Sequence, residues 1–217
     1  MKKIFTLIAA VAFAASASAQ VLSFDTKYDK GAVPGSFTKG DLVLTVTDTD
    51  GKLAVDANSA YFGTSESYVS FDYRLKTGGK SSSKNNLTLT LPTDGTLKVY
   101  ARTGSNSATD RNIVLTQNET ELVNKILLES EADKATIGEV EKNVYPVITV
   151  EAKKGDVAIT YPVNSVNIYA LELVGTSNGV STILTPKADG KTFNLAGVQV
   201  SENAKGLKIK NGKKYVK

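Results

Sequence analysis

Short runs in which apolar and polar residues alternate recur along the chain between residues 42 and 174. The clearest runs read LVLTV at 42–46, YVSFDYRL at 68–75, LTLTL at 87–91, LKVYAR at 97–102 and VAITY at 157–161. A period of two places successive side chains on opposite faces of a strand, and β-branched and aromatic residues favour such pleated surfaces. The pattern therefore predicts a series of half-buried β-strands, each with one face in a core and one in water.

Turn signals separate these runs at fairly even spacing. The pairs Asp50-Gly51 and Asp94-Gly95 favour tight hairpins, because hairpin turns need positive φ. The run VNIYALELV at 166–174 is apolar on both faces, which predicts a central strand. Residues 119–140 are interpreted as a strand followed by an acidic loop. We therefore expect an all-β protein, an antiparallel β-sandwich of jelly-roll type with a small C-terminal β-hairpin appendage.

Residues 1–19 have the pattern of a secretory signal peptide. Two lysines precede an apolar run of about 11 residues, shorter than the roughly 20 that a membrane-spanning helix needs. Ala17-Ser18-Ala19 then matches an A-x-A cleavage site. We expect the protein to be secreted, to the periplasm or the outer cell surface, without a membrane span.

Charge divides the remaining chain into two parts. Residues 186–217 hold eight lysines and two acidic residues, whereas residues 20–185 hold 16 basic and 20 acidic residues. This asymmetry, with the small polar stretch after residue 174, predicts a sandwich domain at 20–176, a linker at 177–185 and a basic β segment at 186–217. The mildly acidic body does not favour nucleic-acid binding.

The chain contains no histidine and no cysteine. This excludes the usual zinc, copper and iron ligands and the Ser-His-Asp and Cys-His catalytic systems. No cofactor is expected, apart from a hard cation held by oxygen ligands. The alternating carboxylates of Asp48 and Asp50 before Gly51 begin like a structural calcium loop, and a plain hairpin turn explains them equally.

The tail carries a first resemblance. The segments Phe193-Asn194-Leu195-Ala196-Gly197, Lys205-Gly206-Leu207 and Asn211-Gly212-Lys213-Lys214 are similar to the end of the sorting domain used by the type IX secretion route in Bacteroides and Prevotella-type bacteria. The resemblance implies an interaction with secretion machinery. The alternative is a terminal hairpin that caps a sheet edge.

The body carries a second resemblance, which spans roughly residues 42–174. The segments RLKTGGK at 74–80, LKVYARTGS at 97–105, YPVN at 161–164 and IYALEL at 168–173 resemble the non-catalytic β-sandwich modules of secreted Bacteroides and Prevotella polysaccharide lyases. The resemblance implies a module that binds carbohydrate or adheres to a surface. A polysaccharide, including an acidic one, is the implied partner.

The candidate binding residues lie on or near one predicted strand. Strand parity places Lys98, Tyr100 and Arg102 on the outward face, and Arg74 and Arg111 are the other two arginines of the chain. A tyrosine ring between cations suits stacking on a sugar, and arginine pairs with a uronate carboxylate. The alternative is that these cations are solvated or pair with cross-strand carboxylates such as Asp72 or Asp110.

Three classes of function fit these patterns. The leading one is a secreted, non-catalytic carbohydrate-binding or cell-surface-associated module. The second is a structural or adhesive protein that binds another protein, for example by sheet-edge pairing. The third is a calcium-assisted polysaccharide lyase, but nothing in the sequence positions a nucleophile or a convergent acid pair, so we expect no enzymatic activity.

Overall fold

A computed structural model describes residues 19–175, 192–194, 207–210 and 213–216. Residues 1–18 of the predicted signal peptide and the predicted linker at 177–185 lie outside the described residues. The chain divides into two compact units, Met1–Thr176 and Ser177–Lys217. Each unit is described by itself.

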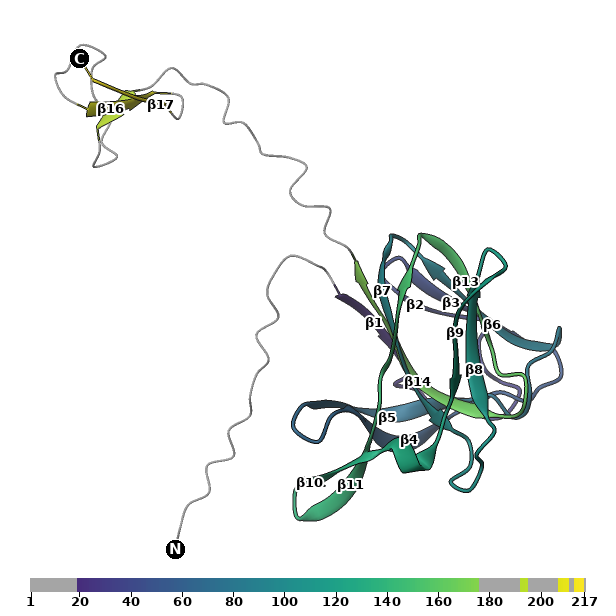
Figure 1. The fold of residues 1–217 in the computed structure, drawn as a ribbon. Helices are drawn as coiled ribbons and strands as arrows, with labels where there is room; N and C mark the ends of the chain where they lie inside the picture. The colour runs from purple at the N-terminus through teal and green to yellow at the C-terminus, as the bar shows by residue number, and fades with distance from the viewer. Residues whose placement is uncertain (1–18, 176–191, 195–206, 211–212, 217) are drawn as a thin grey trace, which may run out of the picture. The chain divides into compact units, whose positions relative to one another are not determined.

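The first unit consists of two sheets that face each other (Figure 1). The eight-stranded sheet has the order β10 (Asp133–Ile137), β11 (Val140–Tyr145), β4 (Ala54–Gly63), β5 (Tyr68–Lys76), β14 (Val166–Gly175), β7 (Gly95–Thr103), β12 (Ile148–Ala152), and β1 (Ala19–Ser23) also pairs with β14. The six-stranded sheet has the order β2 (Ser36–Lys39), β3 (Leu42–Asp48), β6 (Asn85–Leu91), β13 (Gly155–Thr160), β8 (Asn112–Gln117), β9 (Thr120–Ile126).

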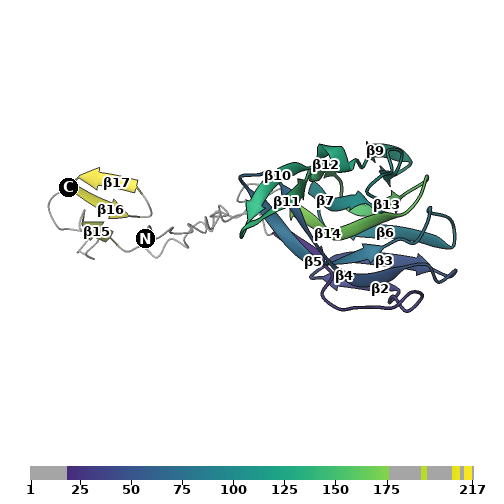
Figure 2. The same ribbon diagram turned by 90° about the horizontal axis from the view of Figure 1, so that it is seen from below.

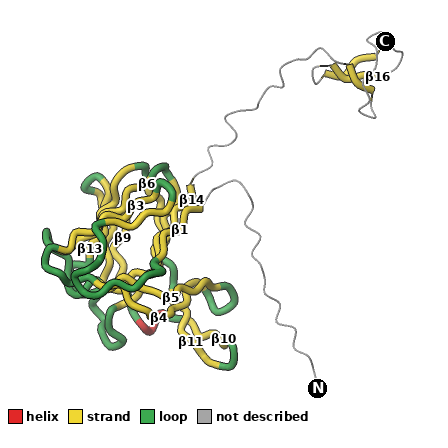
Figure 3. The backbone as a smooth tube through the Cα atoms, turned by 180° about the vertical axis from the view of Figure 1, so that it is seen from behind, coloured by secondary structure: helices red, strands yellow, loops and turns green. Residues whose placement is uncertain are grey.

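The predicted all-β sandwich is confirmed. Every strand pair in the two sheets is antiparallel except β11 with β4. The part of the chain that the structure describes contains no α-helix, and one short 3-10 turn, η1 (Glu129–Glu131), is drawn in red in Figure 3. Nor does the described part contain a helix long and apolar enough to cross a membrane. The jelly-roll connectivity stays a prediction.

The main core lies between the two sheets, and it is built by the alternation seen in the sequence. The inward residues of β3, β6, β7 and β13 are buried and form one cluster: Leu42, Leu44, Val46, Leu87, Leu89, Leu91, Leu97, Val99, Ala101, Val157 and Ile159. The doubly apolar strand β14 is central, as predicted. One of its edges pairs with β7, and the other is shared by β5 at Asn167–Ile168 and by β1 at Ala170–Val174.

Two predicted hairpins are crossovers instead. Asp50-Gly51 connects β3 to β4 and Asp94-Gly95 connects β6 to β7, so each links one sheet to the other. Gly95 is required by close packing, since a Cβ atom there would lie 2.4 Å from the carbonyl oxygen of Val174. Gly95 therefore marks a tight backbone approach at the start of β7, and the hairpin prediction is wrong at both pairs.

Residues 119–140 confirm the predicted strand but not a continuous loop after it. Asn118 and Glu119 both have positive φ, 48° and 63°, and form the tight turn of the β8–β9 hairpin. The acidic stretch then folds as η1, followed by β10, which pairs with β11. The short turn η1 brings Glu129 to the side of the eight-stranded sheet.

A second core covers the outward face of the eight-stranded sheet. The register of β4 and β5 shifts between Ala57 and Ala60, and beyond this bulge the hairpin carries Phe62 and Phe71 onto the neighbouring strands. The ring centroid of Phe62 lies 5.2 Å from that of Tyr169, and the centroid of Phe71 lies 5.0 Å from that of Tyr100. Figure 2 shows β4, β5, β10 and β11 together at one end of the sandwich.

The second unit contains a small antiparallel sheet of three strands. These are β15 (Thr192–Asn194), β16 (Leu207–Lys210) and β17 (Lys213–Val216), in that order. The predicted hairpin is present as β16 and β17, and β15 adds a third strand to it.

Candidate functional site

The structure corrects the predicted stacking tyrosine. Tyr100 does lie on the face predicted by strand parity, but it is only 5% exposed because the β4–β5 hairpin covers it. Its hydroxyl donates to the carboxylate of Glu172, which also accepts from Lys98 Nζ at 3.1 Å. Burial, followed by the hydrogen bond and charge of Glu172, raises the pKa of Tyr100. Neither ring face of Tyr100 is therefore available to a sugar.

Arg102 lies further along the same face in a network with Tyr145 and Glu129. Its Nη1 donates to the hydroxyl of Tyr145, and this hydroxyl donates to Glu129 Oε2 at 2.8 Å. Arg102 Nη1 is also 3.5 Å from Glu129 Oε1. The guanidinium carbon lies 5.1 Å from the ring centroid of Tyr145. Burial raises the pKa of Tyr145, so its hydroxyl stays protonated as a donor.

The other predicted arginines occupy different places. Arg74 donates from Nε to Asp56 Oδ1 at 2.7 Å, so it pairs with a cross-strand carboxylate, which is neither Asp72 nor Asp110. Burial raises the pKa of Tyr169, and the charges of Arg102 and Arg74 oppose this rise. The positive charges of Arg74 and Arg102 thus both act to lower the pKa of Tyr169.

Arg111 belongs to a separate region. Its Nη1 donates to the carbonyl oxygen of Ser165 at 3.0 Å and to the Ser165 hydroxyl at 2.8 Å. These bonds connect the loop before β8 to the loop before β14. Arg111 therefore joins two loops, and the structure does not bring it to Arg102.

The candidate calcium ligands are engaged in the connection between β3 and β4. Asp48 accepts the backbone N–H groups of Lys52 and Leu53 at 2.7 and 3.1 Å. Asp50 Oδ2 lies 2.7 Å from Lys52 Nζ, so a cation from the protein already neutralises it. Within the described residues, no cluster of three or more acidic side chains is placed to hold a metal ion. Both carboxylates thus contribute contacts to this turn, and the calcium site stays a prediction.

A polar pocket of about 410 Å³ lies where β11 runs parallel to β4. We call it the hairpin pocket, and it is lined by Ser59, Ala60, Tyr61, Arg102, Glu141, Lys142, Asn143 and Tyr145. Three of these side chains come from the outer part of β11, which reaches β4 through the pairs Val144–Tyr61 and Tyr145–Phe62. Hydroxyl, amide, carboxylate and cationic groups thus converge in one hollow.

Two tyrosines stand beside this pocket on the outward side of the β4–β5 hairpin. The ring centroids of Tyr61 and Tyr68 are 5.7 Å apart with the rings nearly perpendicular, and Tyr68 is 39% exposed. On the same side of the hairpin, the hydroxyl of Ser59 donates to Asp72 Oδ1 at 3.0 Å. The hairpin therefore offers an accessible aromatic surface, at Tyr68, next to polar groups. The buried Tyr100 offers no such surface.

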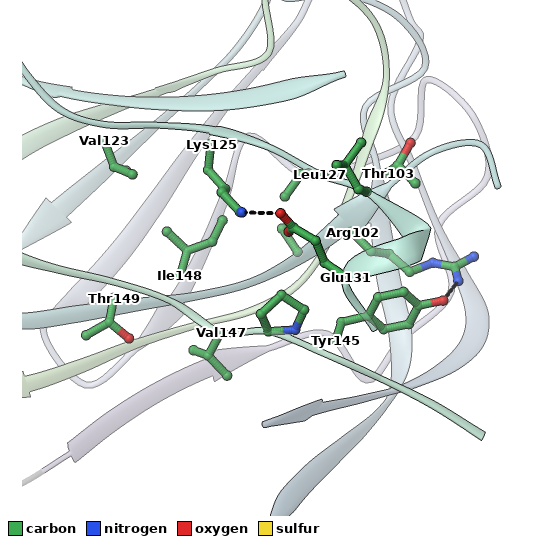
Figure 4. A pocket seen from close by; sticks show the side chains of 13 residues that line it. Arg102, Thr103, Val123, Lys125, Leu127, Glu131, Tyr145, Val147, Ile148 and Thr149 are labelled. Atoms are coloured by element: carbon green, nitrogen blue, oxygen red, sulfur yellow. Dashed lines mark hydrogen bonds and ion pairs between the residues drawn. The ribbon is translucent and has the colours of Figure 1, made fainter. Parts of the chain in front are cut away.

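A second pocket, of about 320 Å³, lies on the other side of Arg102 and Tyr145. We call it the side pocket, and its walls are mostly apolar: Val123, Leu127, Leu128, Pro146, Val147 and Ile148. An ion pair between Lys125 Nζ and Glu131 Oε1, at 2.8 Å, crosses it (Figure 4). Because Arg102 and Tyr145 line both pockets, their network forms the wall between them.

Sequence reasoning missed the residues of the hairpin pocket other than Arg102. Lys142 and Asn143 lie 80 residues from β4 in the chain, and a parallel contact of two residue pairs leaves no local signal. Tyr61 did carry a signal, because Ala60 and Phe62 are its buried neighbours and a period of two places Tyr61 on the opposite face.

Comparisons with known proteins add little. No protein-family profile matches the sequence, and no curated protein matches it. Among solved structures, the isomalto-dextranase of Arthrobacter globiformis T6, in complex with panose, aligns with 73% of this chain at 8% identity and a TM-score of 0.28. The aligned part is 32% of the enzyme's own chain. At this TM-score the similarity supports no statement about function.

Proposed function

We propose that this chain is a non-catalytic carbohydrate-binding module that works outside the cytoplasm, and that the hairpin pocket holds the sugar. The observation that carries the proposal is the position of the half-buried Tyr61 and the exposed Tyr68 beside a hollow lined by polar side chains. A sugar ring presents an apolar face of C–H groups and an edge of hydroxyls. An aromatic surface next to hydrogen-bonding groups complements both at once.

The rest of the chain is consistent with this proposal. The N-terminal pattern predicts export, and the body resembles sandwich modules of secreted polysaccharide lyases. The pocket is built on paired strands, β4 and β11, and its wall is held by the network of Arg102, Tyr145 and Glu129. A site fixed in this way loses little conformational entropy when it binds a ligand.

Binding of the full chain to a panel of neutral and acidic polysaccharides, measured by affinity electrophoresis and calorimetry, tests the proposal. We expect Tyr61→Ala to weaken binding about tenfold, because one stacking surface is lost. Tyr28→Ala is the matched control, since Tyr28 is also half-buried and packs edge-on against one aromatic ring, Phe37, away from the pocket.

Both variants should keep the β-sheet circular-dichroism spectrum. Loss of binding in Tyr61→Ala alone supports the site. A folded wild-type chain that binds none of the polysaccharides overturns the proposed function.

The basic C-terminal segment at 186–217 is proposed to contact the export machinery. Its support is the resemblance described above and its excess of lysine. Deletion of residues 186–217 should leave the protein in the periplasm, measured by fractionation. Unchanged delivery to the cell surface would reject this role.

Protein binding is the second candidate function, and the side pocket favours it. This pocket contacts β12 and β9, one edge strand of each sheet, and its walls are mostly apolar. An extended peptide that pairs with β12 would place side chains into it. Thr149→Glu, which puts a charge at an exposed position of the pocket lining, should abolish binding of such a partner and leave polysaccharide binding unchanged.

A further inference from the structure

The charged groups that line the hairpin pocket are unequally paired. Arg102 lies 3.5 Å from Glu129, and Glu141 lies 3.4 Å from Lys134. Lys142 has no hydrogen bond or ion pair with any residue that the structure describes. Once the paired charges are set aside, one positive charge remains at the pocket.

The hydrogen-bonding groups of the pocket show the same imbalance. Glu129 Oε2 accepts from Tyr145, while Glu129 Oε1 has no hydrogen-bond donor among the described residues. Asn143 Oδ1 accepts from Lys134 Nζ at 2.6 Å. The hydroxyl of Tyr61, however, donates to no described residue, and Arg102 Nε is a buried donor without an acceptor in the described part of the chain. Within the described residues, the lining of the pocket therefore keeps unpaired donors on Tyr61 and Arg102 beside the unpaired charge of Lys142.

From this surplus we infer that the ligand is an acidic sugar, whose carboxylate lies against Lys142. The inference rests on the proposed function and names its substrate class. A uronic acid residue brings two acceptor oxygens and one negative charge to a site that has unpaired donors and one uncompensated cation. A neutral sugar brings hydroxyls that satisfy the donors but leaves the charge of Lys142 unmatched.

The expected size of the preference for an acidic sugar follows from the exposure of Lys142 to solvent. Lys142 is exposed, so its attraction to a carboxylate is screened by water and equals that of a surface ion pair. We expect about a fivefold preference for an acidic polymer over its neutral counterpart. The affinity itself comes from the tyrosines and hydrogen bonds, and the charge sets the selectivity.

A polygalacturonate and the same polymer with its carboxyl groups methyl-esterified separate these contributions. They share one sugar backbone, and the ester removes the negative charge while adding one methyl group per residue. The full-length wild type should bind the acid form about fivefold more tightly than the ester. Lys142→Met keeps the length of the side chain and should remove this preference without weakening binding of the ester. Lys30→Met is the matched control, because Lys30 is exposed and lies outside the lining of the pocket.

Loss of the preference in Lys142→Met, and not in Lys30→Met, supports the inference. Equal wild-type binding of acid and ester overturns it, while the proposed function stands. A preference that persists in Lys142→Met overturns the assignment to this residue. Binding of neither polymer, nor of any other polysaccharide, overturns the inference and the proposed function together.

Discussion

Tyr100 donates its hydroxyl hydrogen to the carboxylate of Glu172, and both side chains are buried on the covered face of the eight-stranded sheet. Lys98 supplies the charge that balances Glu172. A buried carboxylate with two partners tolerates the loss of one badly, because the desolvation cost remains. This tyrosine is therefore part of the structural framework behind the hairpin pocket.

Replacing Tyr100 with phenylalanine removes only this hydroxyl. We expect Tyr100→Phe to lower the free energy of unfolding by about 1.5–3 kcal/mol, the range for a hydrogen bond to a charged group. Urea denaturation measures the change. Tyr68→Phe is the control, since the Tyr68 hydroxyl bonds no described residue, and a similar loss in both variants would contradict a specific role for the Glu172 bond.

The burial of Tyr100 shows what an alternating sequence pattern does not predict, namely which segment packs on the outward face of a strand. Parity correctly placed Lys98, Tyr100 and Arg102 on one face, and the alternation of Leu97 and Val99 correctly identified the opposite face as core. What covers the outward face depends on a bulge at Ala57–Ala60, distant in the chain from β7. A periodic pattern identifies a strand's faces but does not identify what packs on each.

One sequence feature did indicate the cover. The run at 166–174 is apolar on both faces, and β14 lies directly beside β7 in the sheet. A strand that is buried on both faces requires a layer on each side, and this layer extends over the neighbouring strand. Tyr169 and Tyr100 are accordingly buried under the same hairpin.

Alkaline pH should expose the role of the buried tyrosines. The pKa values of Tyr100, Tyr145, Tyr161 and Tyr169 are raised above the ordinary 10.0, with burial the largest cause in each. Because the folded state favours their neutral forms, this contribution to stability is complete below pH 10 and is lost as the pH rises above it.

Tyrosinate absorbance, recorded together with circular dichroism during an alkaline titration, tests this expectation. These four of the nine tyrosines should ionise only as the β-sheet signal is lost. Ionisation of all nine in a chain that keeps its sheet signal would show that the hydroxyls are more accessible than their burial implies.

Acid pH should weaken the pair of Asp56 and Arg74 instead. Burial alone would raise the pKa of Asp56, but the hydrogen bond and charge of Arg74, followed by those of Lys76, lower it below its ordinary 3.8. A depressed folded-state pKa gives stability that is present above pH 3.8 and is lost as the pH falls through the folded value.

Asp56→Asn should therefore destabilise the protein at about pH 7 and make a smaller difference at about pH 2.5, as measured by denaturant midpoints. Asp29→Asn is the control, because the Lys27–Asp29 pair is almost fully exposed and contributes little at either pH. A deficit of Asp56→Asn that is equal at both pH values would show that its effect is steric rather than electrostatic.

The approach of β7 to β14 at Gly95 gives the sharpest steric test of the sandwich. A Cβ atom at residue 95 would lie 2.4 Å from the carbonyl oxygen of Val174 and 2.9 Å from the Cα of Gly175, and both are backbone atoms that cannot rotate away. Gly95→Ala therefore forces the two strands apart at the start of their shared register, with an expected loss of about 1–3 kcal/mol of unfolding free energy.

Gly35→Ala is the matched control, since a Cβ atom there meets nothing within 4 Å and its backbone is not left-handed. Its effect on the free energy of unfolding should stay within about 0.5 kcal/mol. If the two variants unfold at the same denaturant concentration, Gly95 serves chain turning rather than strand packing.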